Sequence, residues 1–480
     1  MAKHSRRSFL HTASAAAAAL SVSARVPMWA QSASAVRMWS TFGSGRHAEA
    51  EAPAWKVSPA TGEAIVVDVS VAKQEILGFG AALTDSSCYV LSQMKDDERQ
   101  SVMHDLFAPG EMAFNVCRTC VGASDYARNQ YSLDESDTPD PEMKKFSIDH
   151  DKAYILPVLR EARQINSDLF LFSSPWSPPG WMKPNRSMLG GAMRKTSFPA
   201  YALYFQKFLE GYKAEGVLID AVTVQNETDA EQEGKMPACL WAQEQEMEFA
   251  AKHLAPALRT AGLSTKIWVL DHNYSLWGRA LDELSDADVY KAIDGIAWHG
   301  YVGDPSAMTR VHDAFPDKNA YWTEGGPDIS LPDYQTDWTK WADTFNGILN
   351  NWARCITAWN IALDEKGKPN IGPFSCGGTV TIENGTIRDA PHKVTRSGQY
   401  HAFAHYTRHV KRGAKVLSTG ATGKSDSGRG LSHVAFRNPD GGYVAVVANP
   451  GPERTVQLEA GRNCLEFKAP ADSVHTLEWS

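Results

Sequence analysis

Short apolar runs alternate with amphipathic segments through the middle of the chain. Eight runs rich in small, β-branched and aromatic residues predict buried strands, at 76–83, 113–121, 169–174, 221–225, 266–270, 295–299, 320–323 and 355–359. Helical spacing of apolar residues predicts helices between them, at 96–106, 151–165, 198–214, 242–261 and 338–354. Strands that alternate with helices favour right-handed βαβ units and a parallel sheet.

An open, doubly wound sheet is the alternative for this alternation. In its nucleotide-binding form, such a sheet has a glycine-rich phosphate turn directly after the first strand. Here the first run, 76–83, is followed by Thr84, Asp85 and two serines. We therefore predict an α/β fold with a closed (β/α)8 TIM barrel at 76–411, whose last helix lies near 397–411.

The pattern changes on both sides of this barrel. Short strands separated by turns are predicted at 36–42, 64–71, 415–418, 433–437, 443–448, 455–458 and 476–479. The turn NPDGG at 438–442 contains Asp-Gly, which supplies the positive φ angles of a tight hairpin. Since neither set has helical partners, we expect the segments 36–75 and 412–480 to form one appended antiparallel β-sandwich.

Residues 1–35 have the features of an export signal. The motif SRRSFL at 5–10 contains an arginine pair and is followed by an alanine-rich apolar run. This order is typical of a twin-arginine signal, and the run is too short to span a bilayer as a helix. We expect cleavage after Ala30 or Ala35, no integral membrane segment in the mature chain, and a bacterial protein that is periplasmic or secreted.

The composition argues against some classes of binding partner. The chain has 43% hydrophobic and 22% charged residues with a net charge of −8, which argues against a partner such as nucleic acid or an anionic membrane. Fifteen Trp and fifteen Tyr provide aromatic faces that suit sugar rings. Nothing in the composition indicates an oligomeric state.

Seven scattered cysteines do not form a disulfide framework. Cys117 and Cys120 have the spacing of a redox or metal pair, but they lie on one predicted strand. Three residues of extended chain separate their Cα atoms by about 10 Å, which is beyond disulfide reach. We expect two buried thiols.

Two predicted strands each end in a glutamate. The stretches AVTVQNE at 221–227 and AYWTEGG at 320–326 run from apolar residues into Glu227 and Glu324. The C-terminal strand ends of a parallel barrel open onto one face, where barrel enzymes hold their catalytic residues. Two carboxyl groups about 5 Å apart on that face would suit glycoside hydrolysis with retention of configuration.

The other strand ends are also polar or aromatic. They carry Asp85, Arg118, Asp125, Trp176, the run 271–273 (DHN), His299, Tyr301, Trp359 and Asn360. Such a set suits a neutral polyhydroxyl ligand and lacks the Lys and Arg density of a phosphate site. A single glutamate at a strand end is usually solvated or caps a helix, and a tryptophan usually packs. The presence of all these residues together at the strand ends favours a catalytic site.

Four longer motifs follow the same strand ends: GFGAALTD at 78–85, SPWSPPGWMK at 174–183, QNE at 225–227 and TEG at 323–325. Together they make the chain similar to glycoside hydrolase family 30, the retaining β-glycosidases that include glucosylceramidases. The resemblance covers about residues 76–360, and the terminal strands resemble the side domain of that family. It implies a carbohydrate or glycoconjugate substrate. We expect no cofactor and no metal.

The resemblance also implies roles for matching residues. Glu227 would be the general acid/base and Glu324 the nucleophile, with Arg118 supporting the nucleophile. The sugar-binding positions would be Asp125, Trp176, Asn226, His299, Tyr301 and Trp359. Among these, Asn226 would contact the sugar 2-hydroxyl, and Trp359 would form the aromatic floor.

Two features depart from the lipid-cleaving members. Gly300 stands where those members have an aromatic residue between His and Tyr, and the segment IGPFSCGG at 371–378 also differs. Both differences bear on which aglycone the enzyme accepts, and neither bears on the expected catalytic reaction. We favour a retaining exo-β-glycosidase of the β-glucosidase or glucosylceramidase kind, with an endo-β-1,6-glucanase as the alternative. A non-catalytic carbohydrate-binding barrel is the alternative of another class, and the presence of both glutamates disfavours it.

Three histidines share one face of the last predicted helix. His401, His405 and His409 have the spacing that metal ligands use. Barrel helices lie on the outside, however, and no acidic residue or cysteine stands near these positions. We therefore expect packed or surface histidines rather than a metal site.

Overall fold

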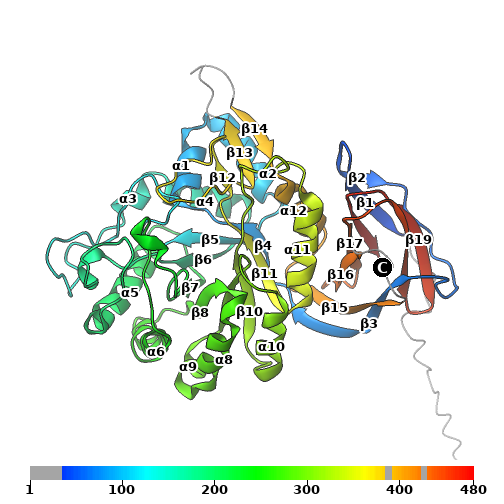
Figure 1. Cartoon of the computed structure of the whole chain (residues 1–480). Coiled ribbons are helices and arrows are strands. Elements are labelled where there is room, and N and C mark those ends of the chain that lie inside the picture. Colours follow the sequence, from blue (N-terminus) through cyan, green and yellow to red (C-terminus); the bar gives the residue numbers. More distant parts are fainter. Residues whose placement is uncertain (1–34, 384–391, 423–429) are drawn as a thin grey trace, which may run out of the picture.

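The computed structural model describes residues 35–383, 392–422 and 430–480. The predicted export signal, except for Ala35, lies outside the described residues. The chain forms a barrel with a β-domain beside it (Figure 1). Within the described ranges, no helix combines the length and the apolar character needed to cross a bilayer.

Eight parallel strands form the barrel, in the spatial order β4-β11-β10-β9-β8-β7-β6-β5. They are β4 (Gly78–Ala81), β5 (Val116–Cys120), β6 (Phe170–Ser174), β7 (Ala221–Thr223), β8 (Lys266–Asn273), β9 (Gly295–His299), β10 (Asn319–Glu324) and β11 (Ala353–Ala358). Between β4 and β5 the backbone N–H of Leu83 donates to the carbonyl of Arg118 at 2.7 Å. A Cβ at Gly80 would overlap the carbonyl oxygen of Val116, so glycine permits this close approach. The predicted TIM barrel is confirmed.

Helices follow the strands around the barrel (Figure 1). They are α1 (Asp85–Gln93), α2 (Asp96–Phe107), α3 (Asp149–Lys152), α4 (Ile155–Ile165), α5 (Phe198–Ala214), α6 (Gln243–Glu248), α7 (Ala255–Thr260), α8 (Trp277–Ser285), α9 (Ala287–Ala292), α10 (Ser306–Ala314), α11 (Trp338–Asn350) and α12 (Gly398–Thr407). The single helix predicted at 242–261 is divided, because a π-helical segment, η5 (Phe249–Leu254), separates α6 from α7. Pro256 stands in the first turn of α7, and its missing N–H prevents a regular α-helical bond there.

The β-domain is one nine-stranded sheet in the order β19-β18-β3-β15-β16-β17-β20-β1-β2. Its strands are β1 (Arg37–Phe42), β2 (Gly45–Ala50), β3 (Ala64–Glu75), β15 (Lys415–Thr422), β16 (Ser432–Arg437), β17 (Tyr443–Asn449), β18 (Arg454–Ala460), β19 (Asn463–Ala469) and β20 (Ser473–Trp479). β1 pairs antiparallel with β20, and β3 pairs antiparallel with β15 and parallel with β18. The predicted pairing of the N-terminal with the C-terminal strands is confirmed, with one parallel pair. The sequence did not predict β2, which has few apolar residues, or β19, which follows β18 after a short turn.

Strand β17 is buried on both faces. Val444 and Val446 belong to the large core shared with the barrel helices, whereas Ala445 and Val447 belong to the interior of the β-domain. Successive side chains of a strand point to opposite faces, so one apolar run packs against both units. The β-domain is therefore joined to the barrel by a continuous core.

His401 and His405 lie on α12, whereas His409 follows the helix, which ends at Thr407. His405 and His409 contact the β-domain. The His405 ring contacts the hydroxyls of Thr476 and Thr41, each at 2.8 Å. His409 Nδ1 lies 2.7 Å from Glu478 Oε1. Burial lowers the pKa of His405 well below its ordinary value, so its ring is neutral and hydrogen-bonded. These two histidines pack against the β-domain, whereas His401 makes an edge contact with the ring of Trp338.

A truncated chain tests this junction. A chain that ends at Arg412 lacks β15 to β20, so β1 loses its partner β20, β3 loses both of its partners, and α11 and α12 lose their apolar cover. We expect insoluble or aggregated protein, measured as the soluble fraction and by size-exclusion chromatography. A truncated chain that remains soluble and monomeric would contradict the shared core.

Candidate active site

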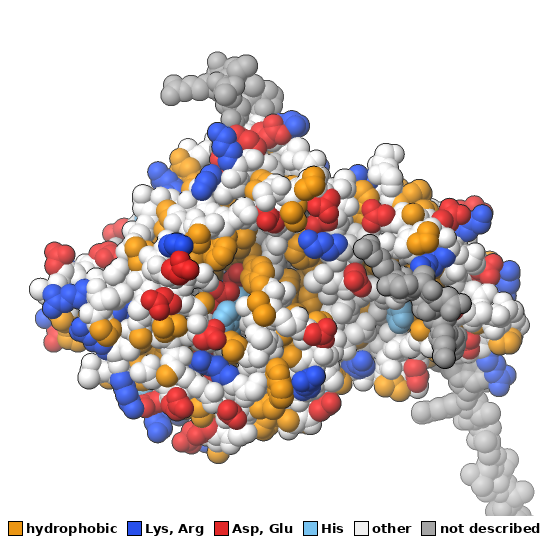
Figure 2. Space-filling model, in the orientation of Figure 1, with side chains coloured by type: hydrophobic (Ala, Val, Ile, Leu, Met, Phe, Trp, Pro, Cys, Tyr) orange, Lys and Arg blue, Asp and Glu red, His pale blue; other side chains and the backbone are white. Residues whose placement is uncertain are grey.

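A pocket of about 360 Å³ lies at the C-terminal ends of the barrel strands. Its lining residues are Asp125, Trp176, Asn226, Glu227, Gln232, Met236, His272, Asn273, Tyr301, Glu324, Trp359, Phe374 and Cys376. Figure 2 shows a hollow on the barrel side of the molecule, with acidic and histidine atoms beside hydrophobic ones. Of the predicted site residues, Arg118 and His299 are not in the lining, because both are completely buried beneath it.

In six of the eight strands the barrel interior changes from apolar to polar over two residues. The lower layer consists of Val116, Phe172, Ala221, Trp268, Ala297, Tyr321 and Cys355. Two positions further along these strands stand Arg118, Ser174, Thr223, His299, Thr323 and Thr357 on the same face. The apolar layer therefore forms the base on which a buried polar layer rests.

Two irregular strand positions complete this polar layer. In β8 the register shifts between Leu270 and His272, and Leu270 and Asp271 both have positive φ, at 72° and 45°. In β10 the register shifts between Trp322 and Glu324. Such bulges redirect side chains at barrel rims. They bring the Asp271 and Glu324 carboxylates into contact with the buried guanidinium of Arg118.

Arg118 connects four side chains from different strand ends. Its guanidinium donates to Glu324 Oε2, to Asp271 Oδ2 at 2.7 Å, to Asn226 Oδ1 at 2.8 Å and to Ser174 Oγ at 3.1 Å. The neighbouring carboxylates raise its pKa although burial opposes them. The group therefore remains charged and sets the positions of its partners.

Asp271 is the carboxylate with the most hydrogen bonds in this layer. Thr223 and Ser174 donate to Oδ2 at 2.7 and 2.9 Å, and Thr323 donates to Oδ1 at 2.7 Å. Burial alone would raise the pKa of Asp271, but Arg118 and these bonds hold it far below its ordinary value. Asp271 is thus a permanent negative charge beneath the pocket.

Glu324 is held on both carboxylate oxygens. The Tyr301 hydroxyl donates to Oε1 at 3.0 Å, and Arg118 donates to Oε2. Burial raises the pKa of Glu324, and the charge of Glu227 adds to this, whereas His299 and Arg118 act in the opposite direction. A carboxylate fixed in this way has a defined orientation toward the pocket.

Glu227 lies in the loop after β7 and has a positive φ of 53°. Gln232 donates to Oε2 at 3.2 Å, and His299 Nδ1 lies 3.4 Å from Oε1. Burial alone would raise the pKa of Glu227, but the hydrogen bond and the charge of His299 lower it below the ordinary value. Its side chain is 14% exposed, so it also reaches solvent.

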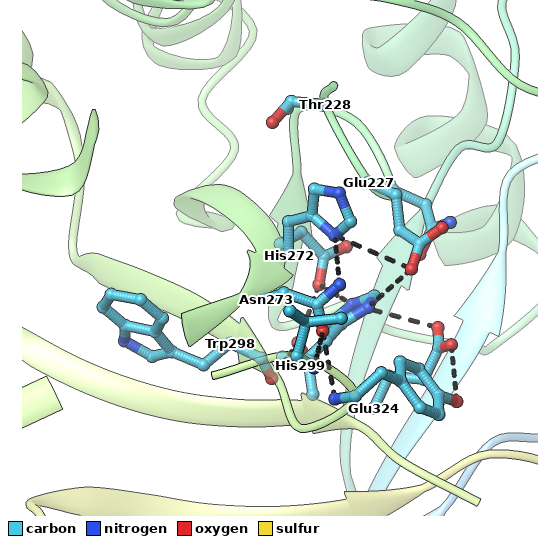
Figure 3. A network of polar contacts seen from close by, with 12 residues as sticks. Glu227, Thr228, His272, Asn273, Trp298, His299 and Glu324 are labelled. Atoms are coloured by element: carbon cyan, nitrogen blue, oxygen red, sulfur yellow. Dashed lines mark hydrogen bonds and ion pairs between the residues drawn. The ribbon is translucent and has the colours of Figure 1, made fainter. Parts of the chain in front are cut away.

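His299 lies between the two glutamates, as Figure 3 shows. Its Nδ1 contacts Glu227, while Nε2 lies 3.1 Å from Asp271 Oδ1 and 3.8 Å from Glu324 Oε2. Burial alone would lower the pKa of His299, but the surrounding carboxylates raise it to about 9. The ring is therefore an imidazolium at neutral pH, in contact with both glutamates.

Two tryptophans cover the buried guanidinium. The rings of Trp176 and Trp359 are stacked with centroids 4.9 Å apart, and Arg118 lies 4.6 Å from the Trp176 centroid. Asp125 stands in the same wall of the pocket, where burial and then the charges of Glu324 and Glu227 raise its pKa. Aromatic faces and a carboxyl group together suit a sugar ring with its hydroxyls.

The chain matches the Glycosyl hydrolase family 30 TIM-barrel domain over residues 76–384. It also matches the Glycosyl hydrolase family 30 beta sandwich domain over residues 413–477. The chain belongs to glycoside hydrolase family 30. The family resemblance found in the motifs is confirmed, and the pocket belongs to a glycoside hydrolase.

Several relatives of this family 30 chain match over most of their length. An endo-1,6-β-D-glucanase of Neurospora crassa is 34% identical, covering 81% of this chain and 82% of the relative. The lysosomal acid glucosylceramidase of Mus musculus is 26% identical, and the match covers 85% of this chain and 81% of the relative. A solved structure described as an endo-β1,6-glucanase has a TM-score of 0.82 at 28% identity, covering 93% of this chain and 99% of that one.

The sequence did not assign some pocket residues of this family 30 chain. Two of them, His272 and Asn273, stand at the end of β8, where the polar strand end was visible but had no assigned role. The others, Gln232, Met236, Phe374 and Cys376, lie in long loops. Such loops have no periodic pattern, so the sequence drew attention only to the segment 371–378, which contains Phe374 and Cys376, and gave no role to its single residues.

A double-mutant cycle tests the charge pair beneath the pocket. Arg118→Met leaves Asp271 and Glu324 buried without their cation, so we expect a loss of about 3–5 kcal/mol of unfolding free energy. Arg118→Met combined with Asp271→Asn should lose less than the sum of the single variants, as measured by denaturant unfolding. Additive losses would show that the two residues are not coupled.

Proposed function

We propose that this family 30 chain is a retaining endo-β-1,6-glucanase. The observation that carries the proposal is the identity to endo-1,6-β-glucanases, at 34% and 31% for the Neurospora crassa and Trichoderma harzianum enzymes. The mouse glucosylceramidase, at 26%, is more distant. The support therefore favours the endo-acting alternative over the exo-β-glucosidase or glucosylceramidase that the sequence analysis put first.

In this proposal the two glutamates divide the chemistry. Glu324, oriented by Arg118 and Tyr301, attacks the anomeric carbon and expels the leaving sugar. The pKa of Glu227 is lowered in the free pocket, so Glu227 takes up the Nδ1 proton of His299, 3.4 Å away, and passes it to the departing oxygen. Glu227 then accepts a proton from the water that cleaves the glycosyl-enzyme.

The rim of the pocket supports a saccharide rather than a lipid aglycone. A Cβ at Gly300 would lie 2.7 Å from the ring of Trp322, so that ring occupies the space of a side chain at position 300. Tyr301 and Phe374, both lining the pocket, are 45% and 43% exposed. Exposed aromatic faces at the mouth suit the stacking of further sugar units outside the cleaved bond.

The predicted export of the enzyme is consistent with a polymeric substrate outside the cytoplasm. The twin-arginine motif at 5–10 supports a periplasmic or secreted enzyme. A glucan chain is too large to cross a cell membrane unaided, so its hydrolysis requires an exported enzyme. Detection of the mature chain outside the cytoplasm, with an arginine-pair variant retained inside, tests this step.

Single substitutions separate the two glutamates. Glu324→Gln should abolish turnover of every substrate, because no carboxylate remains to attack. Glu227→Gln should slow cleavage of poor leaving groups about 10²–10⁴-fold but spare glycosylation by a dinitrophenyl β-glycoside. A pre-steady-state burst and azide rescue to a β-glycosyl azide should follow. Glu231→Gln, an exposed carboxylate in the same loop, is the control and should retain activity.

The azide product distinguishes the roles. An α-glycosyl azide from Glu227→Gln, or rescue of Glu324→Gln to a β product, would show that the roles are reversed. No turnover by the unaltered enzyme on any β-glycoside would favour the non-catalytic carbohydrate-binding barrel instead.

A substrate screen tests the linkage and mode of action. We expect β-1,6-glucan to be cleaved to mixed oligosaccharides, with much slower cleavage of glucosylceramide and aryl β-glucoside. Product sizes by chromatography, together with the early fall in polymer length, measure endo action. Glucose as the sole early product, or faster hydrolysis of glucosylceramide, would return the function to the exo-glycosidase alternative.

A further inference from the structure

Two histidines beside Glu227 are each oriented by a carboxylate. His272 Nε2 lies 2.5 Å from Asp229 Oδ1, and His299 Nε2 lies 3.1 Å from Asp271 Oδ1. A carboxylate at one ring nitrogen keeps the proton there and makes the other nitrogen the coordinating atom. In both rings that second nitrogen is Nδ1.

Both Nδ1 atoms converge on one oxygen. Glu227 Oε1 lies 3.4 Å from His299 Nδ1 and 3.6 Å from His272 Nδ1. The three residues each offer a ligand atom, and these atoms lie within 4.8 Å of one another. Neighbouring ligands around tetrahedral Zn²⁺ stand about 3.3 Å apart, so the ligand atoms must move closer together by up to about 1.5 Å when the ion binds. Figure 3 shows both rings directed at Glu227.

We propose that Glu227, His272 and His299 form a binding site for one Zn²⁺ ion or a similar nitrogen-preferring divalent metal. Glu227 and His272 line the pocket, so an ion reaches them from solvent and its fourth position remains open to water. Two imidazole ligands disfavour Mg²⁺ and Ca²⁺, which prefer oxygen. Coordination by His299 displaces its Nδ1 proton to solvent.

The site would be inhibitory, and this consequence rests on the proposed function. A metal on Glu227 Oε1 occupies the carboxylate that must exchange a proton with the leaving group and with water. The ion would thus block hydrolysis reversibly, and a chelator would restore it. The ligands stand on three separate strand ends, so the spacing 227, 272, 299 shows no metal motif in the sequence.

Isothermal titration calorimetry tests the binding. The full chain is first freed of metal with EDTA and is then titrated with ZnCl₂. We expect one ion to bind per chain. His272→Gln should weaken the binding of Zn²⁺ by more than about 100-fold. Asp229→Asn, which removes only the orienting carboxylate, should weaken it by about 10–100-fold. The control is His47→Gln, because His47 Nε2 lies 2.8 Å from His409 Nε2, another pair of imidazoles in contact. This control should bind as the unaltered chain does.

Co²⁺ provides a readout independent of catalysis, since a tetrahedral site with nitrogen ligands gives visible absorption bands. Absence of stoichiometric Zn²⁺ binding, or binding that persists in His272→Gln and disappears in His47→Gln, would overturn the site. Thermal unfolding of each variant establishes that it is folded. Zn²⁺ binding that depends on His272 but leaves hydrolysis unchanged would retain the site and refute the catalytic role of Glu227.

Discussion

The site depends on one buried guanidinium. Arg118 stands on β5 and bonds side chains from the ends of β6, β7, β8 and β10. An uncompensated charge in a barrel core would be costly, so the charge of Arg118 must be paired where it lies. Asp271 and Glu324 meet that requirement, and in doing so they acquire fixed positions. The same set of contacts therefore satisfies the electrostatic constraint and fixes the geometry of the pocket.

The same constraint explains the layered interior of the barrel. An apolar layer around Trp268 and Tyr321, whose rings stack 3.9 Å apart, supports the polar layer from below. Trp176 and Trp359 cover it from above. Between them the hydrogen bonds are sheltered from water and gain strength. His299 carries a proton in this layer because carboxylates surround it, and it links the environments of the two glutamates.

The β-domain influences the pocket from a distance, through helix α12. Its strand β17 shares the barrel core, while the buried His405 of α12 bonds to hydroxyls on β1 and β20. In addition, Gln399 of α12 donates to the carbonyl of Gly325, directly after Glu324. The helix that the β-domain holds in place is thus bonded to the backbone that presents one of the two glutamates.

The sequence by itself determined the class of fold and indicated the residues that are proposed for the site. The alternation of apolar runs with helical segments predicted the barrel, because parallel strands covered on both faces must be apolar throughout. The glutamates could be found because strand ends at one barrel face have to be polar. The polar strand β2 gave too weak a pattern to be recognised.

Only the tertiary structure decided how these side chains meet. The bulges at Leu270 and before Glu324 turn two carboxylates toward Arg118, and no residue pattern predicts such a register shift. The convergence of His272 and His299 on Glu227 likewise depends on three strands side by side. Loop residues such as Phe374 enter the pocket from far along the chain. Local propensity acts over a few residues, whereas these contacts join residues tens of positions apart, so packing of the whole barrel had to fix them.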